Sequence, residues 1–549
     1  MTRETLIQDL EGLTLGRALR RAAEHHADRE CFKDGDQVYS FKQFDRAVDS
    51  VSELLLNAGI GAGDHVSGWL GNSIEWALLF FACGRVGAVM VPINTRYTAR
   101  EVEYILRESD SKLLVMQTKA YDKSFVNVLT EIAPDISSQR SNEISSIALP
   151  MLKAVITIGD NPPAFARDFQ DAFGIQTDLE KLKALDSSVD PTQPLIICYT
   201  SGTTGHPKGV MHNHAVIKQA TRVGLALDLQ PGEKILGHMP LYHVAGLYMG
   251  LVPAVMIGAC FVNMRQWDPE KALDILENDR VTAFGGIPTH FVDLCNHSSI
   301  GQRDLSAMRN AWIGGSPVMR STFESFKEKL NIKQLMSTYG MTENTISTTF
   351  NTLDDPLEIC CSNTAPVLGP SEVKIMNVDA AKECAPGETG EIWCRGDTVM
   401  MGYYKNPQAT AEVLSDEGWL RTGDLGCLES NGYLRVTGRL KDMYKSGGTN
   451  VYPTEVEQVL VAHPKIKLVS IVGIPHERLG EVGHAIVQCH DGESVTIESI
   501  RSFCKNRIAQ YKVPHGLTLV AEMPRTNTGK IDKAQLRQIV KTETEGEKI

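Results

Sequence analysis

The sequence has no excess of basic residues. It contains 55 Lys and Arg against 67 Asp and Glu, and its net charge at neutral pH is −12 over 549 residues. Proteins that bind nucleic acid through its phosphates usually carry a basic balance or a basic stripe. Neither occurs here, so we expect no nucleic-acid partner. A polyanionic ligand would have to be bound by a few local Lys, Arg and backbone N–H groups.

Cysteine pairs of the CxxC type are also absent. The twelve cysteines are scattered singly, apart from the adjacent Cys360 and Cys361. This pattern argues against a zinc framework and a disulfide scaffold, and favours free thiols in a reducing compartment. The first residues include acids and no apolar core of the signal-peptide type, and the last three, EKI, are not a peroxisomal signal. We therefore expect a cytoplasmic protein.

Long apolar runs are rare, and the longest uncharged one extends over residues 244–264. Its length approaches that of a membrane span, but Gly246, Gly250, Pro253 and Gly258 interrupt it. Within it, AVMIGACFV (254–262) is typical of a buried strand. A helix, a turn and a strand of a parallel sheet explain the run better than a membrane helix. We expect no membrane span.

What the sequence does contain is a regular alternation of buried strands and amphipathic helices over its first four-fifths. This alternation predicts an α/β fold with largely parallel sheets, whose ligands bind where strands end. Residues of about 360–438 have short strands between Gly and Pro turns, which indicates a small β-rich subdomain. We predict a large N-terminal domain of layered α/β sheets (1–438) that includes this subdomain, and a small mobile α+β domain (439–549).

A loop rich in Gly, Ser and Thr directly follows the apolar run PLIIC. Residues 199–210 read YTSGTTGHPKGV. Glycines let backbone N–H groups converge on an anion, hydroxyls donate hydrogen bonds and Lys208 supplies charge. The pattern GxxxxGK[ST] does not fit, so this is no Walker A loop. The alternative is a surface linker, but a linker would seldom follow a buried strand so abruptly.

This loop resembles the signature of the adenylate-forming superfamily, which includes acyl-CoA synthetases, peptide-synthetase adenylation domains and beetle luciferases. Other motifs of that family recur in order along almost the whole chain. They are PLYHVAG (240–246), GGIPTHF (285–291), GGSP (314–317), STYGMTE (337–343), GEIWCRG (390–396), GWLRTGDLG (418–426), GRLKDMYKSGG (438–448) and PRTNTGK (524–530).

The resemblance implies ATP and Mg²⁺ as cofactors, and a role for each motif. Glu343 would bind the metal, with Thr342 donating to the α-phosphate, Asp424 and Arg439 would bind the ribose, and Lys530 would stabilise the transition state of adenylation. On their own, Glu343 and Lys530 would be read as solvated surface groups. The residues implied in ATP and AMP binding are Thr200, Ser201, Gly202, Thr203, Thr204, Lys208, Gly315, Ser316, Pro317, Tyr339, Gly340, Met341, Asp424 and Arg439.

The resemblance further implies coenzyme A as the second substrate. Lys441 matches the hinge about which the C-terminal domain turns after the first half-reaction. Lys445, Ser446, Gly447 and Gly448 would then line the tunnel for the pantetheine arm, and His243 would stand at the gate between that tunnel and the acyl pocket. By itself, His243 could equally be a histidine satisfied within the core.

The predicted function is that of a carboxylic acid–CoA ligase that forms an acyl-adenylate and then a thioester. The acyl pocket is expected near Val244, Ala245, Thr289 and His290, where no Arg or Lys could bind a second carboxylate. We therefore expect an aliphatic or alicyclic monocarboxylic acid. His290 could either meet a substrate oxygen or make a structural hydrogen bond.

Three other functions stay open at this point. An adenylation enzyme that loads a carrier protein would share every ATP motif, although little sequence follows Lys530 that could form a fused carrier domain. A catalytically idle homologue is disfavoured because Lys208, Glu343, Asp424 and Lys530 are all present. A luciferase-type oxygenase is a third reading. The oligomeric state is open as well, although the family often forms a homodimer through its large domain.

Overall fold

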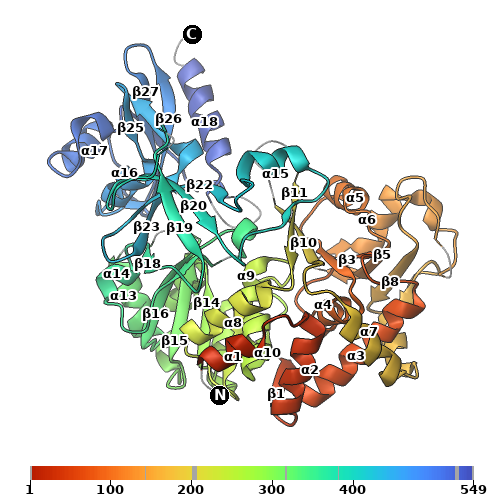
Figure 1. The fold of residues 1–549 in the computed structure, drawn as a ribbon. Helices are drawn as coiled ribbons and strands as arrows, with labels where there is room; N and C mark the ends of the chain where they lie inside the picture. Colours follow the sequence, from red (N-terminus) through yellow and green to blue (C-terminus); the bar gives the residue numbers. More distant parts are fainter. Residues whose placement is uncertain are drawn as a thin grey trace.

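The computed structural model describes residues 3–120, 122–141, 144–200, 207–315, 318, 320–345, 347–380, 382–525 and 531–546. Two large sheets form its main body, and two smaller sheets lie toward the C-terminus (Figure 1). The predicted α/β class is thereby confirmed.

The first large sheet is parallel except at its two edges. In spatial order it consists of β17 (Thr349–Phe350), β16 (Gln334–Tyr339), β15 (Asn310–Gly314), β14 (Ala283–Gly286), β12 (Lys234–Gly237), β13 (Cys260–Asn263), β1 (Glu30–Asp34) and β2 (Gln37–Ser40).

The second large sheet is parallel from β10 to β9 and antiparallel at its other edge. Its order is β21 (Gly402–Tyr403), β11 (Lys208–Asn213), β10 (Pro194–Thr200), β4 (Val89–Pro92), β3 (His65–Trp69), β5 (Leu113–Gln117), β8 (Ala154–Ile158) and β9 (Arg167–Asp168).

Helices fill the space between the two sheets and cover their outer faces. The largest buried cluster joins residues of both sheets to the central helices, so the layers follow the order α–β–α–β–α. The central helices are α2 (Leu15–His26), α3 (Phe41–Asn57), α4 (Ile74–Val86), α8 (Val216–Ala226) and α10 (Val252–Ile257). α5 (Ala99–Glu108) and α6 (Phe125–Ile132) cover the second sheet, while α11 (Pro269–Asn278), α12 (Pro288–Asn296) and α13 (Arg320–Lys329) cover the first.

Helix α4 shows why this core needs apolar sequence on every side of a helix. All but one of its thirteen residues are buried, which is expected of a helix enclosed between two sheets. Ser73 caps its first turn, and Gly87 ends it in the left-handed region at φ 74°. Strand β4 begins two residues after Gly87, so this segment is a helix, a glycine turn and a strand.

The uncharged run 244–264 is no membrane helix. Within the part of the chain that the structure describes, no helix is both long and apolar enough to cross a bilayer. The prediction of a strand over AVMIGACFV is wrong in its first half, because Ala254–Ile257 continue the helix. Gly258 ends that helix at φ 88°, and strand β13 begins only at Cys260. An apolar run buried on all sides does not reveal its own period, which explains the error.

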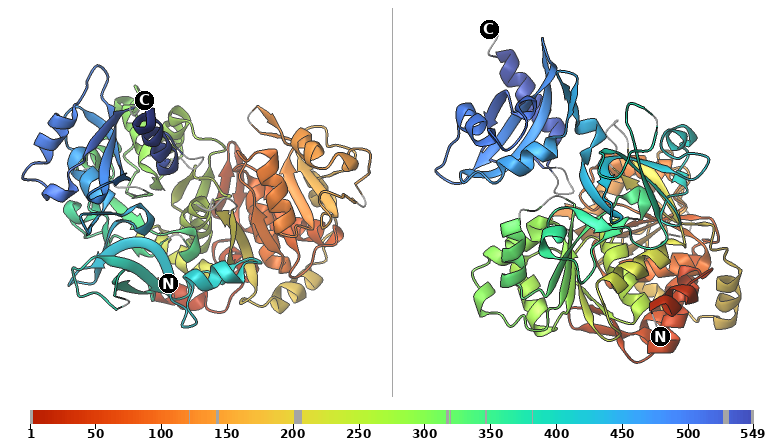
Figure 2. Two further views of the ribbon diagram at one scale, coloured as in Figure 1. Left: turned by 90° about the horizontal axis from the view of Figure 1, so that it is seen from above. Right: turned by 60° about the vertical axis from the view of Figure 1, so that its left-hand side comes forward.

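A small antiparallel sheet follows in the chain, made of β18 (Thr364–Pro366), β23 (Tyr433–Arg439), β22 (Leu420–Leu428), β20 (Gly390–Arg395) and β19 (Glu372–Met376). The last sheet holds β25 (Thr449–Val451), β24 (Tyr444–Ser446), β27 (Gly480–Cys489), β26 (Ile466–His476) and β28 (Gly516–Leu519). Helices α16 (Pro453–Leu460), α17 (Ile497–Cys504) and α18 (Lys533–Gly546) accompany it, and together they form a separate lobe (Figure 2).

Candidate functional site

The Gly- and Thr-rich loop joins two antiparallel strands. Thr200 ends β10, Lys208 begins β11, and the two residues are paired across the hairpin. The Thr200 hydroxyl donates to the carbonyl of Lys208 over 3.5 Å. The predicted ligands Ser201, Gly202, Thr203 and Thr204 lie outside the described residues. The strands therefore place both ends of the predicted phosphate loop side by side.

The predicted metal ligand lies on a single 3₁₀ turn (Thr342–Asn344) after β16. Glu343 is half-buried, and its Oε1 accepts a hydrogen bond from the hydroxyl of Tyr403 at 3.1 Å. Burial raises the pKa of Glu343 above its ordinary value, an effect that the hydrogen bond from Tyr403 opposes. Among the described residues, no Lys or Arg forms an ion pair with it. A desolvated carboxylate of this kind suits a bound cation.

Two further contacts brace the same turn. The backbone N–H of Met400 donates to the carbonyl of Glu343 over 2.8 Å. The buried His212 of β11 donates from Nε2 to the carbonyl of Thr342 over 2.6 Å. Burial lowers the pKa of His212 to about 4, so the imidazole is neutral at neutral pH. The phosphate-loop strand and the Glu343 turn are thus tied together.

Asp424 contacts two other predicted nucleotide-binding residues, Tyr339 and Arg439. It is 7% exposed, and its Oδ2 accepts a hydrogen bond from the hydroxyl of Tyr339 over 2.8 Å. Its other oxygen lies 3.3 Å from Nε of Arg439, its cross-strand partner on β23. Burial and the neighbouring Asp424 charge raise the pKa of Tyr339 well above its ordinary value. Tyr339 is therefore a neutral donor whose hydroxyl holds the carboxylate in place.

The remaining nucleotide residues lie where neighbouring parallel strands end. Gly315 follows β15 in the left-handed region at φ 90°, and a Cβ there would lie 3.2 Å from Cγ2 of Ile287. Gly340 and Met341 form the link from β16 to the Glu343 turn, both half-buried. Ser316 and Pro317 lie outside the described residues.

A narrow apolar cavity of about 10 Å³ lies between the first large sheet and the helical segment 244–251. Its lining is Ile235, Leu236, Gly237, Met239, Ala245, Gly246, Met249, Gly250, Phe261, Gly285 and Trp312. Of the four predicted acyl-pocket residues, only Ala245 is among them. Val244 is buried beside it, and Thr289 is exposed.

His290 lies on the other side of strand β14 from this cavity. Successive residues of a strand point to opposite faces. A Cβ at Gly285 would meet the Trp312 ring, which lines the cavity, whereas one at Gly286 would meet His290 and His238. His290 Nδ1 lies 3.1 Å from Nε2 of the buried His238. The placement thus favours the structural hydrogen bond over a contact with substrate.

His243 is exposed, so the reading as a core histidine is wrong. It is the N-cap of the short helix α9 (Val244–Gly246), and its Nδ1 accepts from the N–H of Ala245 over 3.1 Å. Its ring thus stands at the start of the segment that lines the apolar cavity.

The predicted tunnel residues form the tip of a hairpin in the C-terminal lobe. Lys445 and Ser446 end β24, and β25 begins at Thr449. Gly447 and Gly448 make the turn at φ 57° and 81°, where non-glycine residues are disfavoured. The hairpin turn alone therefore explains both glycines. The Lys445 ammonium lies 3.2 Å from Asp379 of the small sheet, with both side chains half exposed or more.

The predicted hinge residue lies between the two smaller sheets. Lys441 is exposed on a 3₁₀ turn (Leu440–Asp442) that links β23 to β24, and the next residue, Asp442, forms an ion pair with Arg537 of α18 at 2.7 Å. Lys530, the predicted catalytic lysine, lies outside the described residues.

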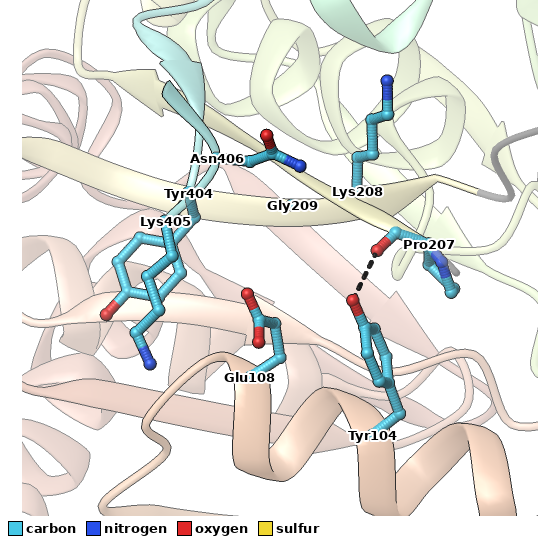
Figure 3. Close-up of a pocket in the computed structure, with 8 residues that line it drawn as sticks. All are labelled: Tyr104, Glu108, Pro207, Lys208, Gly209, Tyr404, Lys405 and Asn406. Carbon is cyan, nitrogen blue, oxygen red and sulfur yellow. Dashed lines mark hydrogen bonds between the residues drawn. The ribbon is translucent and has the colours of Figure 1, made fainter. Parts of the chain in front are cut away.

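A second, larger cavity lies beside Lys208 and Gly209, at the start of β11. Its lining includes Tyr104 and Glu108 of α5 with Tyr404 and Lys405, and the Lys208 side chain points away from Glu108 (Figure 3). The hydroxyl of Tyr104 donates to the carbonyl of Pro207 over 3.3 Å, at the end of the phosphate loop.

Two family models match the chain. The model of the AMP-binding enzymes covers residues 19–404, and that of the AMP-binding enzyme C-terminal domain covers 455–530. The chain therefore belongs to the AMP-binding, adenylate-forming enzymes, within the acyl-CoA synthetase and ligase group that its relatives define. ATP is a ligand of this family.

The relatives cover almost the whole chain. The putative acyl-CoA synthetase YngI of Bacillus subtilis is 33% identical over 96% of both chains. The human mitochondrial medium-chain acyl-CoA ligase ACSF2 is 32% identical over 96% of this chain and 88% of its own. The structure of ATP-bound MatB from Rhodopseudomonas palustris has a TM-score of 0.82 and 25% identity, and the match covers 95% of this chain and 98% of that one.

Sequence reasoning missed Tyr403 and His212. A signal for His212 existed, because Lys208, Val210 and His212 alternate along one strand and so share a face. No such signal existed for Tyr403, which reaches the site by pairing with β11 from nearly two hundred residues further along the chain.

Proposed function

We propose that the chain is an ATP-dependent carboxylic acid–CoA ligase. In the first half-reaction a carboxylate oxygen attacks the α-phosphorus of ATP, and the bond to pyrophosphate breaks. In the second, the thiol of coenzyme A attacks the acyl carbon, its proton is lost, and AMP leaves. Both half-reactions bring anions together, so they need charge neutralisation and alignment more than a protein nucleophile.

The observation that carries this proposal is one connected set of polar contacts. Thr200 and Lys208 close the phosphate hairpin, and Lys208 lies over the ring of Tyr403, whose hydroxyl donates to Glu343. The charges of Asp424 and Arg439 act on the same Glu343 carboxylate. Groups suited to phosphate, metal and ribose are thus neighbours in the fold, although the sequence separates them by more than two hundred residues.

Glu343 is the residue that would hold Mg²⁺. Magnesium needs only one or two protein carboxylates, because phosphate oxygens and waters complete its shell. Glu343 meets this need as a desolvated carboxylate with no ion pair among the described residues. Bound there, the metal would neutralise phosphate charge. Lys208 would contact the outer phosphates, Tyr339 and Asp424 would position the nucleoside, and Lys530 would place its charge beside the reacting carboxylate.

The apolar lining of the narrow cavity supports an apolar acyl group, although the cavity would have to widen to admit one. None of the described residues that line it is charged, so nothing there would pair with a second carboxylate. The rings of Trp312 and Phe261 fill the space beside Gly285 and Gly237, where an added Cβ would lie 2.1 Å from either ring. We therefore propose an aliphatic or alicyclic monocarboxylic acid as substrate.

Coenzyme A is the proposed acceptor, and the main alternative is the phosphopantetheine of a carrier protein. The relatives named as acyl-CoA synthetase and ligase support coenzyme A. The hinge at Lys441 and the tunnel at Lys445, Ser446, Gly447 and Gly448 belong to the same proposal. The location of Lys441 between two separately built sheets supports it.

The test is ATP–pyrophosphate exchange over a panel of linear, cyclic and dicarboxylic acids, followed by product analysis with and without coenzyme A. We expect exchange with apolar monoacids and a thioester only when coenzyme A is present. Exchange without a thioester would redirect the proposal to a carrier protein. Malonate turnover equal to that of the best monoacid would contradict the proposed substrate class.

A further inference from the structure

Tyr403 occupies a position between the two charged groups that would handle the phosphates. Strand β21 pairs antiparallel with β11, and Tyr403 lies directly opposite Val210. Paired residues of neighbouring strands point to the same face, and so does Lys208, two residues before Val210. The strand register therefore brings the Tyr403 ring to the side of the sheet where the Lys208 side chain projects.

The ring contacts both groups at once. Its hydroxyl donates to Oε1 of Glu343 over 3.1 Å, and Nζ of Lys208 lies 4.9 Å from its centroid. The ring is 8% exposed, so it is packed in one orientation. A phenol is protonated at neutral pH and so acts as the donor in this hydrogen bond.

This arrangement keeps two opposite charges apart. A lysine and a glutamate this close to one ring would gain by forming an ion pair, which would use up both charges before any ligand bound. The phenol hydrogen bond occupies one Glu343 oxygen, and the aromatic face holds the ammonium through a cation–π contact. Each charge is thus left available for its ligand.

We propose that Tyr403 is a positioning residue for adenylation, which holds Glu343 and Lys208 apart and oriented toward the metal and the outer phosphates of ATP. This inference rests on the proposed function. Because acyl-adenylate carries no β- or γ-phosphate, Tyr403 is needed in the first half-reaction and dispensable in the second.

The neighbouring residue supplies a matched control. Tyr404 points to the opposite side of the strand, where its hydroxyl donates to Asp110 over 2.9 Å and its ring packs on His65. It lines a cavity with Tyr104 and Glu108 of α5 (Figure 3). Tyr403→Phe and Tyr404→Phe thus each remove one hydroxyl that donates to a carboxylate. Only the hydroxyl of Tyr403 donates to a residue of the proposed adenylation site, Glu343.

The experiment compares both variants with the wild-type chain in each half-reaction. For Tyr403→Phe we expect acid-dependent ATP–pyrophosphate exchange to fall about 10- to 100-fold, as for loss of a hydrogen bond to a charged group, and to require more Mg²⁺. Thioester formation from supplied acyl-adenylate and coenzyme A should be unchanged. Tyr404→Phe should match the wild type in both assays.

Calorimetry supplies a readout that does not depend on turnover. Tyr403→Phe should bind Mg-ATP more weakly and AMP as tightly as the wild type, and Tyr403→Leu, which also removes the ring beneath Lys208, should weaken Mg-ATP further. The inference would be overturned if Tyr403→Phe and Tyr404→Phe had the same exchange rate and the same affinity for Mg-ATP. It would also be overturned if Tyr403→Phe slowed both half-reactions equally. If the wild type shows no exchange with any acid, the proposed function fails, and Mg-ATP binding still decides the role of Tyr403.

Discussion

The turn that carries Glu343 and the hairpin that carries Lys445–Gly448 are built in opposite ways. Buried or half-buried contacts from Tyr403, Met400 and His212 hold the first. The hairpin is joined to the small sheet by an ion pair between exposed side chains, a contact of the kind that contributes little stability. The contrast suits the proposed function, in which the nucleotide groups are fixed in advance and the C-terminal lobe moves. Three substitutions test the two half-reactions behind this contrast, in order of expected effect, and a fourth tests the acid stability of the fold.

The largest effect is expected for Lys530→Gln. If the lysine charge stabilises the adenylation transition state, exchange should fall on the order of 10²- to 10³-fold. Thioester formation from supplied acyl-adenylate should survive far better, and lysine acetylation should act like the substitution. The control is Lys533→Gln, which removes a lysine paired with Glu457 at 2.8 Å. Full exchange activity in Lys530→Gln would exclude the catalytic role.

The next effect concerns Asp424. Asp424→Asn should raise KM for ATP about 10- to 100-fold, because a charged acceptor for Tyr339 and Arg439 is lost together with the proposed ribose ligand. A comparable pair lies outside the site, where the Tyr433 hydroxyl donates to the buried Asp355 over 2.6 Å. Asp355→Asn should change stability and leave KM for ATP alone. Equal KM values in the two variants would remove Asp424 from the nucleotide site.

A smaller effect is expected for the hairpin, and it should fall on the second half-reaction and not on the first. Gly448→Ala forces a side chain into the left-handed region at φ 81°, a strain of about 1 kcal/mol, with no neighbouring atom for the new Cβ to meet. Thioester formation should slow a few-fold, while pyrophosphate exchange stays unchanged. Gly432→Ala has the same φ and the same open surroundings in the turn between β22 and β23. If Gly448→Ala reduced pyrophosphate exchange more than thioester formation, the hairpin would belong to the adenylation step and not to the thioester step.

The smallest effect concerns acid stability. His214 is buried, accepts a hydrogen bond at Nδ1 from the N–H of Leu15 over 2.9 Å, and burial lowers its pKa to about 4. The unfolded chain therefore binds a proton that the folded chain does not bind between pH 6.5 and 4. Stability should fall as the pH drops through this window.

Denaturant unfolding at pH 7 and pH 5 measures this loss. His214→Asn, which keeps an acceptor and removes the titrating ring, should lose less stability between the two pH values than the wild type. His25→Asn, a change at an exposed ring, should behave like the wild type. An unchanged loss in His214→Asn would mean that other groups set the acid stability.

Much of the fold and part of the site were predictable from sequence. Strand and helix alternation gave the layered α/β class, and motif order led to Thr200, Lys208, Glu343, Asp424 and Arg439, which the fold brings together. These residues stand on turns and strand ends, where local sequence and structure agree. Their roles stay proposals.

The remainder depends on contacts between distant segments. Tyr403 reaches Glu343 only because β21 pairs with β11, and His290 turns toward His238 only because Gly286 follows Gly285 on the strand. The helix over Ala254–Ile257 was missed because burial on every side erases the apolar period. The tunnel role of Gly447 and Gly448 stays a proposal, because the turn by itself already accounts for both glycines.

The most direct test of the account is a pair of single-turnover assays on Glu343→Gln, a change that keeps the side-chain shape and removes its charge. The account predicts that acid-dependent pyrophosphate release collapses, while supplied acyl-adenylate is still converted to thioester by coenzyme A. Pyrophosphate release at the wild-type rate would contradict it, because the groups that surround Glu343 would then not be the adenylation site.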